Sequence, residues 1–493
     1  MSPTSPTPVN RDEAPVRERG DACPGALRLH AADDGRLARL RLPAGVLTSR
    51  QARVLADAAE RLGDGRLDIT SRGNVQLRGL GESCGGELAA LLHGAGLLPS
   101  EEHERVRNVV ASPLAGLDGR GFGEVQAWAR ELDALLCASP EATALSGRFL
   151  FALDDGRGDV AGLGADVTLL ARSAGTAELR TGANRPGLRV SAADAPRAAL
   201  LAAETFLTVA AACGTGAWRV RELPAGSGFT DGAGFTDGAG FTDGSGFTDG
   251  SGFTDGSGGG LEAAIASALA GAGIAAESVP PDRERETDSE GGPETGLEDG
   301  PEAGGPAPGL VHSPDGRTAA LSVYAPLGRL SVAQWRMLAM EDATLRVTPW
   351  RGVIVLVPGL DPGAARDLLD RFRTAGLVTA PDSVWQGVGA CTGRPGCAKS
   401  LSDVRADAAA VSSDVPSAGG PVGLLPVYWS GCERRCGRPQ GDHVDVVATG
   451  EGGYEISVRG VRAVRGSAPI ARTHTRTELA DAVATARTTT MTR

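Results

Sequence analysis

Four cysteines in the last quarter of the chain have the type and spacing to bind a metal centre. Cys391 and Cys397 form a C-x5-C pair, and after 34 further residues Cys432 and Cys436 form a C-x3-C pair. Four thiolates from two loops can close a tetrahedral site or hold a cuboidal cluster. Zinc sites favour about two to four residues within each pair, so this spacing favours a [4Fe-4S] cluster. Zinc and four unrelated thiols are the alternatives.

The composition limits the compartment and the partners. Eight cysteines in 493 residues are too few for a disulfide scaffold, and the first 20 residues are polar. No run approaches the roughly 18 to 20 apolar residues of a membrane span, so we expect a cytoplasmic protein outside the membrane. The net charge of −12 argues against a nucleic-acid partner, although residues 282–302 contribute nine acids against two arginines.

A low-complexity tract divides the chain. Residues 226–255 repeat a Gly-rich hexapeptide containing GFTD, and an acidic, Pro- and Gly-rich stretch continues to about residue 309. Such sequences bury too little apolar surface to offset the entropy of ordering. We therefore expect a flexible linker at 224–309, in which the Ala-rich segment 261–277 could form a short helix, and unstructured tails at 1–20 and 486–493.

The segments on the two sides of this linker resemble each other. Residues 34–45, 47–59 and 67–77 pair in order with residues 315–326, 330–342 and 345–355. Each set has the pattern strand, helix, strand, with Thr48 and Ser331 as N-caps, and helices at 85–95 and 362–375 complete the units. Two such units could pair into one sheet about a pseudo-twofold axis.

Three motifs resemble those of one enzyme superfamily. The stretches SGCERRCGRP (430–439), LDITSRGNVQLRG (67–79) and RNVVASPLAGLD (107–118) are similar to the cluster motif and the two tetrapyrrole-contacting motifs of the sirohaem nitrite and sulfite reductases. The resemblance covers nearly everything except the N-terminal tail and the linker. It implies an α+β fold with ferredoxin-like half-domains at 21–100 and 310–380. It also implies α/β domains at 101–223 and 381–485, the second of which binds the iron-sulfur cluster.

The resemblance also implies roles for individual residues. The four clustered cysteines would be the ligands of a [4Fe-4S] cluster, and Cys436 would be the one that bridges to a sirohaem iron in the reductases. Arg72 and Arg107 match arginines that pair with carboxylates on the rim of the tetrapyrrole, and Gln76 and Asn108 are their neighbours in the motifs. The other cysteines, Cys23, Cys84, Cys137 and Cys213, have no partner spacing.

One departure from the superfamily bears on the reaction. The reductases hold sulfite or nitrite with a Lys-x-Lys pair, whereas the corresponding stretch SGRFLF contains Arg148 and Leu150. Loss of one cation removes a charge-assisted contact worth about 1.5 to 3 kcal/mol. With the stretch CPGALRLHAADDGRLARLRLPAG (23–45), this places the chain nearest a branch of O2-dependent monooxygenases of aerobic cobalamin biosynthesis. These enzymes convert precorrin-3A to precorrin-3B by hydroxylating C20 and closing a γ-lactone from the ring A acetate.

This branch implies a particular set of partners. The tetrapyrrole would be the substrate, its carboxylates held by arginines including Arg148. O2 would be the oxidant, and NADH acting through a reductase, or ferredoxin, would supply electrons to a monomeric enzyme. A mononuclear non-haem iron is also implied, for which His443 and His103 are candidates, although no two-histidine, one-carboxylate set is visible. The alternatives are a sirohaem-dependent sulfite or nitrite reductase and a non-catalytic electron-transfer or tetrapyrrole-carrier protein.

Overall fold

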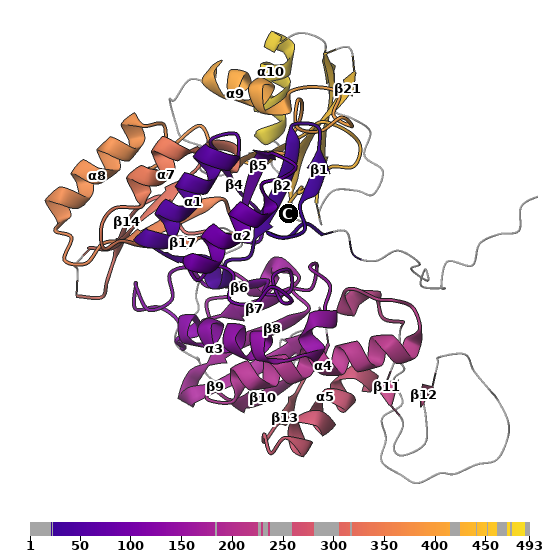
Figure 1. The fold of residues 1–493 in the computed structure, drawn as a ribbon. Coiled ribbons are helices and arrows are strands. Elements are labelled where there is room, and N and C mark those ends of the chain that lie inside the picture. The colour runs from indigo at the N-terminus through magenta and orange to yellow at the C-terminus, as the bar shows by residue number, and fades with distance from the viewer. Residues whose placement is uncertain are drawn as a thin grey trace, which may run out of the picture. The chain divides into compact units, whose positions relative to one another are not determined.

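The chain forms two compact units (Figure 1). Unit 1 contains Met1–Cys23, Val106–Ala111 and Gly121–Glu302, and unit 2 contains Pro24–Arg105, Ser112–Arg120 and Ala303–Arg493. The computed structural model describes residues 21, 23–182, 185–224, 228–229, 235–236, 259–280, 305–315, 318–414, 424–439, 441–450, 452–460, 471–473 and 476–488. The N-terminal tail expected at 1–20 lies outside these residues. The domain expected at 101–223 is divided, because Ser112–Arg120 belongs to unit 2.

Unit 2 contains two five-stranded sheets built alike. The first has the order β1 (His30–Ala32), β2 (Gly35–Leu40), β5 (Val75–Leu80), β4 (Arg66–Ile69) and β16 (Arg329–Ser331). The second has the order β14 (Gly309–His312), β15 (Thr318–Tyr324), β18 (Gly352–Leu356), β17 (Thr344–Val347) and β3 (Val46–Thr48). Each sheet thus takes its last strand from the opposite side of the linker. The expectation of one shared sheet is wrong, because β3 and β16 cross over and complete two separate sheets.

Four helices cover these sheets: α1 (Ser49–Leu62), α2 (Gly85–Gly94), α7 (Val332–Leu338) and α8 (Pro362–Thr374). Thr48 and Ser331 are the N-caps of α1 and α7, as expected, and each forms a capping box with the glutamine three residues later. The two sheets and these helices share one apolar core. Within it the indole of Trp335 on α7 donates to the carbonyl of Ala52 on α1 at 2.8 Å.

The C-terminal part of unit 2 is a third sheet. Its order is β19 (Val388–Ala390), β20 (Val427–Ser430), β21 (His443–Gly450), β22 (Gly453–Arg459) and β23 (Ala471–Thr473), with β19, β20 and β21 parallel. Val444, Val446 and Ala448 of β21 pack in one core with residues of α9 (Val404–Asp414) and α10 (Arg476–Arg487). Since side chains alternate along a strand, His443 and Asp445 point to the opposite face. The C-terminal tail starts later than expected because Ala486 in α10 is fully buried.

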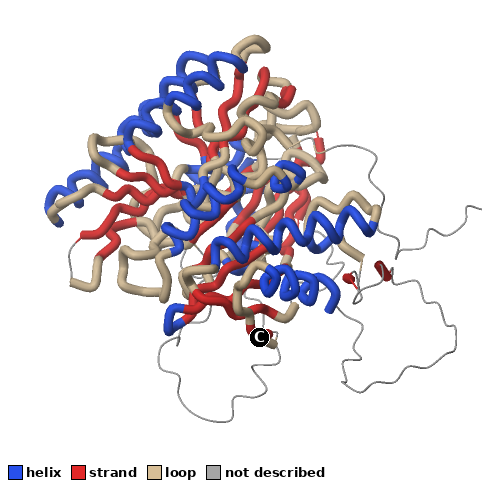
Figure 2. The backbone as a smooth tube through the Cα atoms, turned by 60° about the horizontal axis from the view of Figure 1, so that its bottom comes forward, coloured by secondary structure: helices blue, strands red, loops and turns tan. Residues whose placement is uncertain are grey.

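Unit 1 contains a six-stranded sheet. Its order is β13 (Glu277–Val279), β10 (Gly187–Ser191), β9 (Thr176–Thr181), β8 (Val167–Arg172), β7 (Phe151–Asp154) and β6 (Val109–Ala111). The strands β6, β7 and β8 are parallel and the others antiparallel, the same pattern as in the third sheet of unit 2. The helices α3 (Val125–Ala138), α4 (Ala195–Cys213) and α5 (Gly259–Gly271) pack in this unit. Figure 2 shows the helices of the chain in blue and the strands in red.

Part of the expected linker is folded. The helix α5 packs against α4, and β13 extends the sheet by pairing with β10. Leu261, Ile265 and Leu269 recur every four residues and are at most 1% exposed, so they form the apolar stripe that holds α5. The Gly-rich repeat is described only at β11 (Gly228–Phe229) and β12 (Phe235–Thr236), which pair with each other.

One described helix, α4, is long and apolar enough to cross a membrane. Half of its apolar window is buried inside the protein, where it packs against β8 and β9. The length and composition of α4 therefore match those of a core helix as well as those of a membrane span.

Candidate metal centre and tetrapyrrole-contacting residues

The two cysteine pairs follow neighbouring parallel strands. Cys391 comes directly after β19, and Cys432 follows the end of β20 by two residues. The register pairs Ala390 with Trp429, and the ladder continues where the amide of Cys391 donates to the carbonyl of Trp429 at 2.9 Å. Because the carboxyl ends of parallel strands meet at one edge, the two loops leave the sheet side by side.

The four thiols converge at this edge. Burial raises the pKa of the Cys436 thiol, and the nearby thiols of Cys432, Cys391 and Cys397 raise it further. All four cysteines are free. The amide of Gly431 also donates to Sγ of Cys391 at 3.2 Å, which joins the second loop to the first.

The spacing of the sulfur atoms bears on which metal they fit. No three of the described thiol or imidazole ligand atoms in this region lie within 4.8 Å of one another. Tetrahedral zinc needs sulfur atoms about 3.8 Å apart, given Zn–S bonds of about 2.3 Å. A cuboidal cluster accepts a wider set, because each cysteine binds a different iron atom. The described thiols are therefore not spaced as in a closed zinc site, and their type and number are those of the ligands of a cluster.

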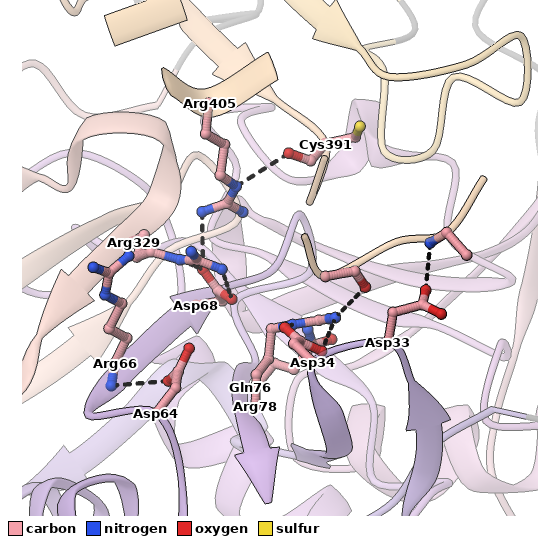
Figure 3. A network of polar contacts seen from close by, with 12 residues as sticks. Asp33, Asp34, Asp64, Arg66, Asp68, Gln76, Arg78, Arg329, Cys391 and Arg405 are labelled. Atoms are coloured by element: carbon pink, nitrogen blue, oxygen red, sulfur yellow. Dashed lines mark hydrogen bonds and ion pairs between the residues drawn. The ribbon is translucent and has the colours of Figure 1, made fainter. Parts of the chain in front are cut away.

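Polar side chains hold the loop of Cys391 and Cys397 by its main chain (Figure 3). Arg405 in the first turn of α9 donates through Nε to the carbonyl of Cys391 at 3.1 Å. Arg78 on β5 donates through Nη2 to the carbonyl of Gly396 at 2.7 Å. The amide of Ala398 donates to the carboxylate of Asp33. The first half-domain thus contacts this loop at two points, and α9 at a third.

The loop of Cys432 and Cys436 is fixed from the sheet below it. The Tyr428 hydroxyl on β20 donates to the carbonyl of Cys436 at 2.6 Å. Arg435 has a φ of 47° and donates through Nε to the fully buried carboxylate of Asp445 on β21 at 2.6 Å. A non-glycine residue in the left-handed region needs such support from its surroundings. Of the arginines in this motif, Arg435 therefore points inward, whereas Arg434 and Arg438 are exposed.

Asp68 on β4 pairs with two arginines, one of which also contacts the loop of Cys391 and Cys397. Its carboxylate accepts two hydrogen bonds from Arg329, at 2.7 and 2.9 Å, and one from Arg405 at 3.1 Å. Burial raises the pKa of the Asp68 carboxyl, but the charges of Arg405 and Arg329 outweigh burial and leave that pKa below its ordinary value. Asp68 therefore remains ionised between two arginines.

Arg72 and Gln76 lie in unit 2, in and after the turn that connects β4 to β5. Arg72 is half-buried, and its amide donates to the hydroxyl of Thr70 at 3.3 Å. Gln76 on β5 is buried and its side-chain oxygen accepts from Arg39 at 3.0 Å. Gly73, with a φ of 65°, makes the tight turn possible because it has no Cβ.

Arg107, Asn108 and Arg148 lie in unit 1. Arg107 is buried and makes a two-point ion pair with Asp133, at 2.6 and 2.7 Å. The fully buried Asn108 amide donates to the carbonyl of Phe149 at 3.0 Å, so the two motifs meet next to Arg148. The Arg148 side chain is exposed, and its guanidinium stacks 4.8 Å from the ring centre of Trp218.

Leu150 stands where the resemblance to the reductases predicts their second lysine. Its side chain is buried, and its amide donates to Asp166 at 2.8 Å. Asp166 also forms a 2.5 Å ion pair with Arg219. Leu150 is thus a buried apolar side chain whose main chain is held by a carboxylate that is itself paired with Arg219.

The two candidate histidines are each buried. His443 opens β21, with Nδ1 2.7 Å from the carbonyl of Gly441 and Nε2 without a hydrogen-bond partner. Nδ1 of His103 lies 2.7 Å from the hydroxyl of Ser100. Over the part of the chain that the structure describes, neither histidine belongs to a set of three closely spaced metal ligands. The residues present therefore do not fit a mononuclear iron with a facial triad.

A carboxylate cluster that the sequence analysis did not consider lies after β7. Asp154, Asp155 and Asp159 are buried with carboxylate oxygens within 4.8 Å of one another. The Asp154 carboxylate accepts four main-chain N–H bonds from residues 156–161, and that of Asp155 is paired with Arg157. These partners indicate that the carboxylates shape the loop.

The sequence analysis also missed Arg405, Asp68 and Arg78. Asp68 lies four residues before Arg72 in the same motif, and Arg405 follows the first cysteine pair in the first turn of the next helix. A charged residue inside a buried strand such as β4 is a signal that could have identified Asp68. The partners of Asp68, however, come from segments 261 and 337 residues away.

Comparison with known proteins agrees with this architecture. Residues 30–93 match the family described as the Nitrite/Sulfite reductase ferredoxin-like half domain. The solved structure of the Mycobacterium tuberculosis NirA protein superposes with a TM-score of 0.59 at 17% identity, covering 90% of this chain and 79% of that one. The chain therefore contains a segment that matches this half-domain family and shares its overall fold with the NirA protein.

The curated relatives that the chain resembles include two kinds of enzyme. A ferredoxin–nitrite reductase from Synechococcus elongatus is 39% identical over 127 residues, which are 24% of this chain and 25% of that protein. A precorrin-3B synthase from a Sinorhizobium species is 32% identical over 168 residues, which are 34% of this chain and 36% of that protein. The chain thus matches about a quarter and about a third of these two relatives, both of them oxidoreductases.

Proposed function

We propose that this protein is a precorrin-3B synthase, a monooxygenase that uses O2 to convert precorrin-3A to precorrin-3B. The observation that carries the proposal is the buried Leu150 in place of the second lysine of the anion-binding pair. With only Arg148 left at that position, a small oxyanion loses one of its two cationic contacts. The match to the Sinorhizobium precorrin-3B synthase supports the same choice.

The tetrapyrrole substrate carries acetate and propionate groups, for which arginine is the appropriate partner. We assign Arg72 and Arg148 as contacts to these carboxylates, with Gln76 and Asn108 orienting the segments that contain the motifs. Asp133 already binds two nitrogen atoms of Arg107. We therefore expect Arg107 to contribute to substrate binding mainly through its position and charge.

The four clustered cysteines, Cys391, Cys397, Cys432 and Cys436, would hold a [4Fe-4S] cluster, which supplies electrons for the activation of O2 when bound. The two alike sheets in unit 2 and the shared strand pattern of the two α/β parts support a duplicated architecture. The described residues do not offer a facial triad, so we assign no step to a mononuclear iron. We further propose a cytoplasmic, monomeric enzyme that receives electrons from ferredoxin or from NADH through a reductase.

The test is isotopic. Anaerobically purified protein with its cluster reconstituted is mixed with precorrin-3A and an electron donor, and 18O2 is then admitted. We expect the product mass to exceed that of the substrate by the mass of one 18O atom, with the second oxygen atom of O2 leaving as water. Incubation under N2 is the control, and a product without 18O would refute the monooxygenase proposal.

The second candidate is a sirohaem-dependent nitrite or sulfite reductase. It is supported by the match to the Synechococcus nitrite reductase and by the exposed position of Cys436, the residue that would bridge to a sirohaem iron. Absorption and EPR spectra of the purified protein separate the two candidates. A cluster signal without sirohaem supports the synthase, whereas a Soret band with donor-dependent reduction of nitrite or sulfite supports the reductase.

A further inference from the structure

One guanidinium group connects the loop of the first cysteine pair to the first half-domain. Arg405 donates through Nε to the main-chain carbonyl of Cys391 and through Nη1 to the carboxylate of Asp68, each at 3.1 Å. Its side chain is 15% exposed. Figure 3 shows Arg405 between these two partners. The planar fork of arginine allows one rigid group to bind both, which a lysine ammonium on a flexible stem does not reproduce.

Asp68 is held in place independently of Arg405. It lies on β4 opposite Arg329 of β16, and these two residues are direct partners in the antiparallel register. Arg329 binds both carboxylate oxygens, at 2.7 and 2.9 Å. Asp68 is therefore a fixed anchor, and the position of the Arg405 guanidinium follows from it.

Three atoms of Cys391 form hydrogen bonds, two in the main chain and one in the side chain. Its amide donates to the carbonyl of Trp429, its Sγ accepts from the amide of Gly431, and its carbonyl accepts from Arg405. The first two contacts come from β20 and the residue after it, within the same sheet. Of these three contacts, only the one with Arg405 connects Cys391 to the first half-domain, because Arg405 also binds Asp68.

We propose that Arg405 is a positioning residue that aims the Cys391 thiolate at the cluster and keeps it there. This inference rests on the proposed [4Fe-4S] centre and extends it to a residue that touches neither iron nor substrate. Partners of this kind orient metal ligands, and their loss typically weakens metal binding by about 10- to 100-fold.

The test compares three variants of the full-length protein carrying the cluster. Arg405→Lys keeps the positive charge and removes the fork, whereas Arg405→Gln removes both. Arg329→Lys is the matched control, because Arg329 binds the same Asp68 carboxylate without touching Cys391. The measurements are iron and sulfide per chain, the EPR spectrum of the reduced cluster, and the rate at which a chelator removes iron.

We expect Arg405→Lys to release iron at least about tenfold faster than the unchanged protein and to shift the g values of the reduced cluster. Arg405→Gln should show faster iron release and shifted g values at least as strongly. If the lysine variant does not fold, the glutamine variant alone is compared with the unchanged protein. Arg329→Lys should leave the g values unchanged.

Three results would count against specific parts of this account. If Arg405→Lys behaves like the unchanged protein, the positioning role is refuted. If Arg329→Lys alters the cluster as much as Arg405→Lys, the effect belongs to Asp68 and the surrounding fold, and the positioning role is again refuted. If the unchanged protein assembles no cluster, the proposed function itself has failed before any variant is compared.

Discussion

At the scale of single residues, charge pairing inside unit 2 determines how the cysteine loops are held. Asp68 joins arginines from two other segments, and Asp445 secures the left-handed Arg435 between Cys432 and Cys436. Breaking one partner of a buried pair leaves an uncompensated charge, at a cost of about 3 to 5 kcal/mol. The surface arginines of the same motif, Arg434 and Arg438, have no comparable role in the described contacts.

The Asp68 pairing predicts a pH dependence of stability. The folded-state pKa of Asp68 lies below its ordinary value of 3.8, so the ionised form stabilises the fold above that value, and the stabilisation is lost as the pH falls below it. We expect Asp68→Asn to lower the free energy of unfolding by about 3 kcal/mol at pH 7 and by less at about pH 3.

Urea unfolding followed at both pH values measures this difference. The control is Asp370→Asn, because the Asp370 pair with Arg373 on α8 is exposed and should contribute less than about 1 kcal/mol. Equal losses for the two variants at pH 7 would contradict the role assigned to Asp68.

At the scale of elements, the segment 259–280 changes the domain description. It lies between a Gly-rich repeat and an acidic, Pro- and Gly-rich stretch, so it was expected to belong to a flexible linker. Yet Leu261, Ile265 and Leu269 of α5 are buried where this helix packs in unit 1, and β13 adds to the sheet. Three apolar residues at helical spacing are enough to dock a helix when a complementary face is available.

We predict that Ile265→Ala destabilises unit 1. The side chain is 1% exposed, and truncation of such a residue costs about 2 to 4 kcal/mol. Thermal unfolding monitored by circular dichroism should show a lower transition temperature, whereas the exposed Ser267→Ala on the same helix should show little change. An unchanged transition in Ile265→Ala would mean that α5 is not part of the folded unit.

At the scale of the whole molecule, the residues proposed to bind the cluster and the substrate belong to both compact units. The four cysteines, Arg72 and Gln76 belong to unit 2, whereas Arg107, Asn108 and Arg148 belong to unit 1. The fold shared with the NirA protein covers 90% of the chain, whereas the two curated relatives match 24% and 34% of it. Loading the cluster should therefore affect the two units unequally.

We predict that cluster removal destabilises unit 2 more than unit 1. A bound group stabilises the part that binds it, because the unfolded part does not bind. Hydrogen exchange measured before and after anaerobic chelation of iron should lose protection in β19, β20 and α9. The helices α3 and α4 serve as the internal reference. Equal loss of protection in both units would contradict a cluster held by unit 2 alone.

The sequence by itself determined the local features. The cysteine spacing, the N-caps at Thr48 and Ser331 and the two strand-helix-strand patterns depend on residues only a few positions apart. The helices α1, α2, α7 and α8 lie where these patterns predicted them. The resemblance to the nitrite and sulfite reductases came from the same motifs. The roles of the arginines and cysteines remain predictions that the experiments above address.

Only the tertiary structure decided which distant segments meet. In the fold, β16 pairs with β4 and β3 pairs with β17, which gives two sheets where one shared sheet was expected. The fold also places α5 and β13 in unit 1. It also brought Arg405 to Asp68 across 337 residues. The reason is physical: strand partners and buried ion pairs are chosen by the packing of the whole fold, whereas caps and helical periodicity are set by neighbours along the chain.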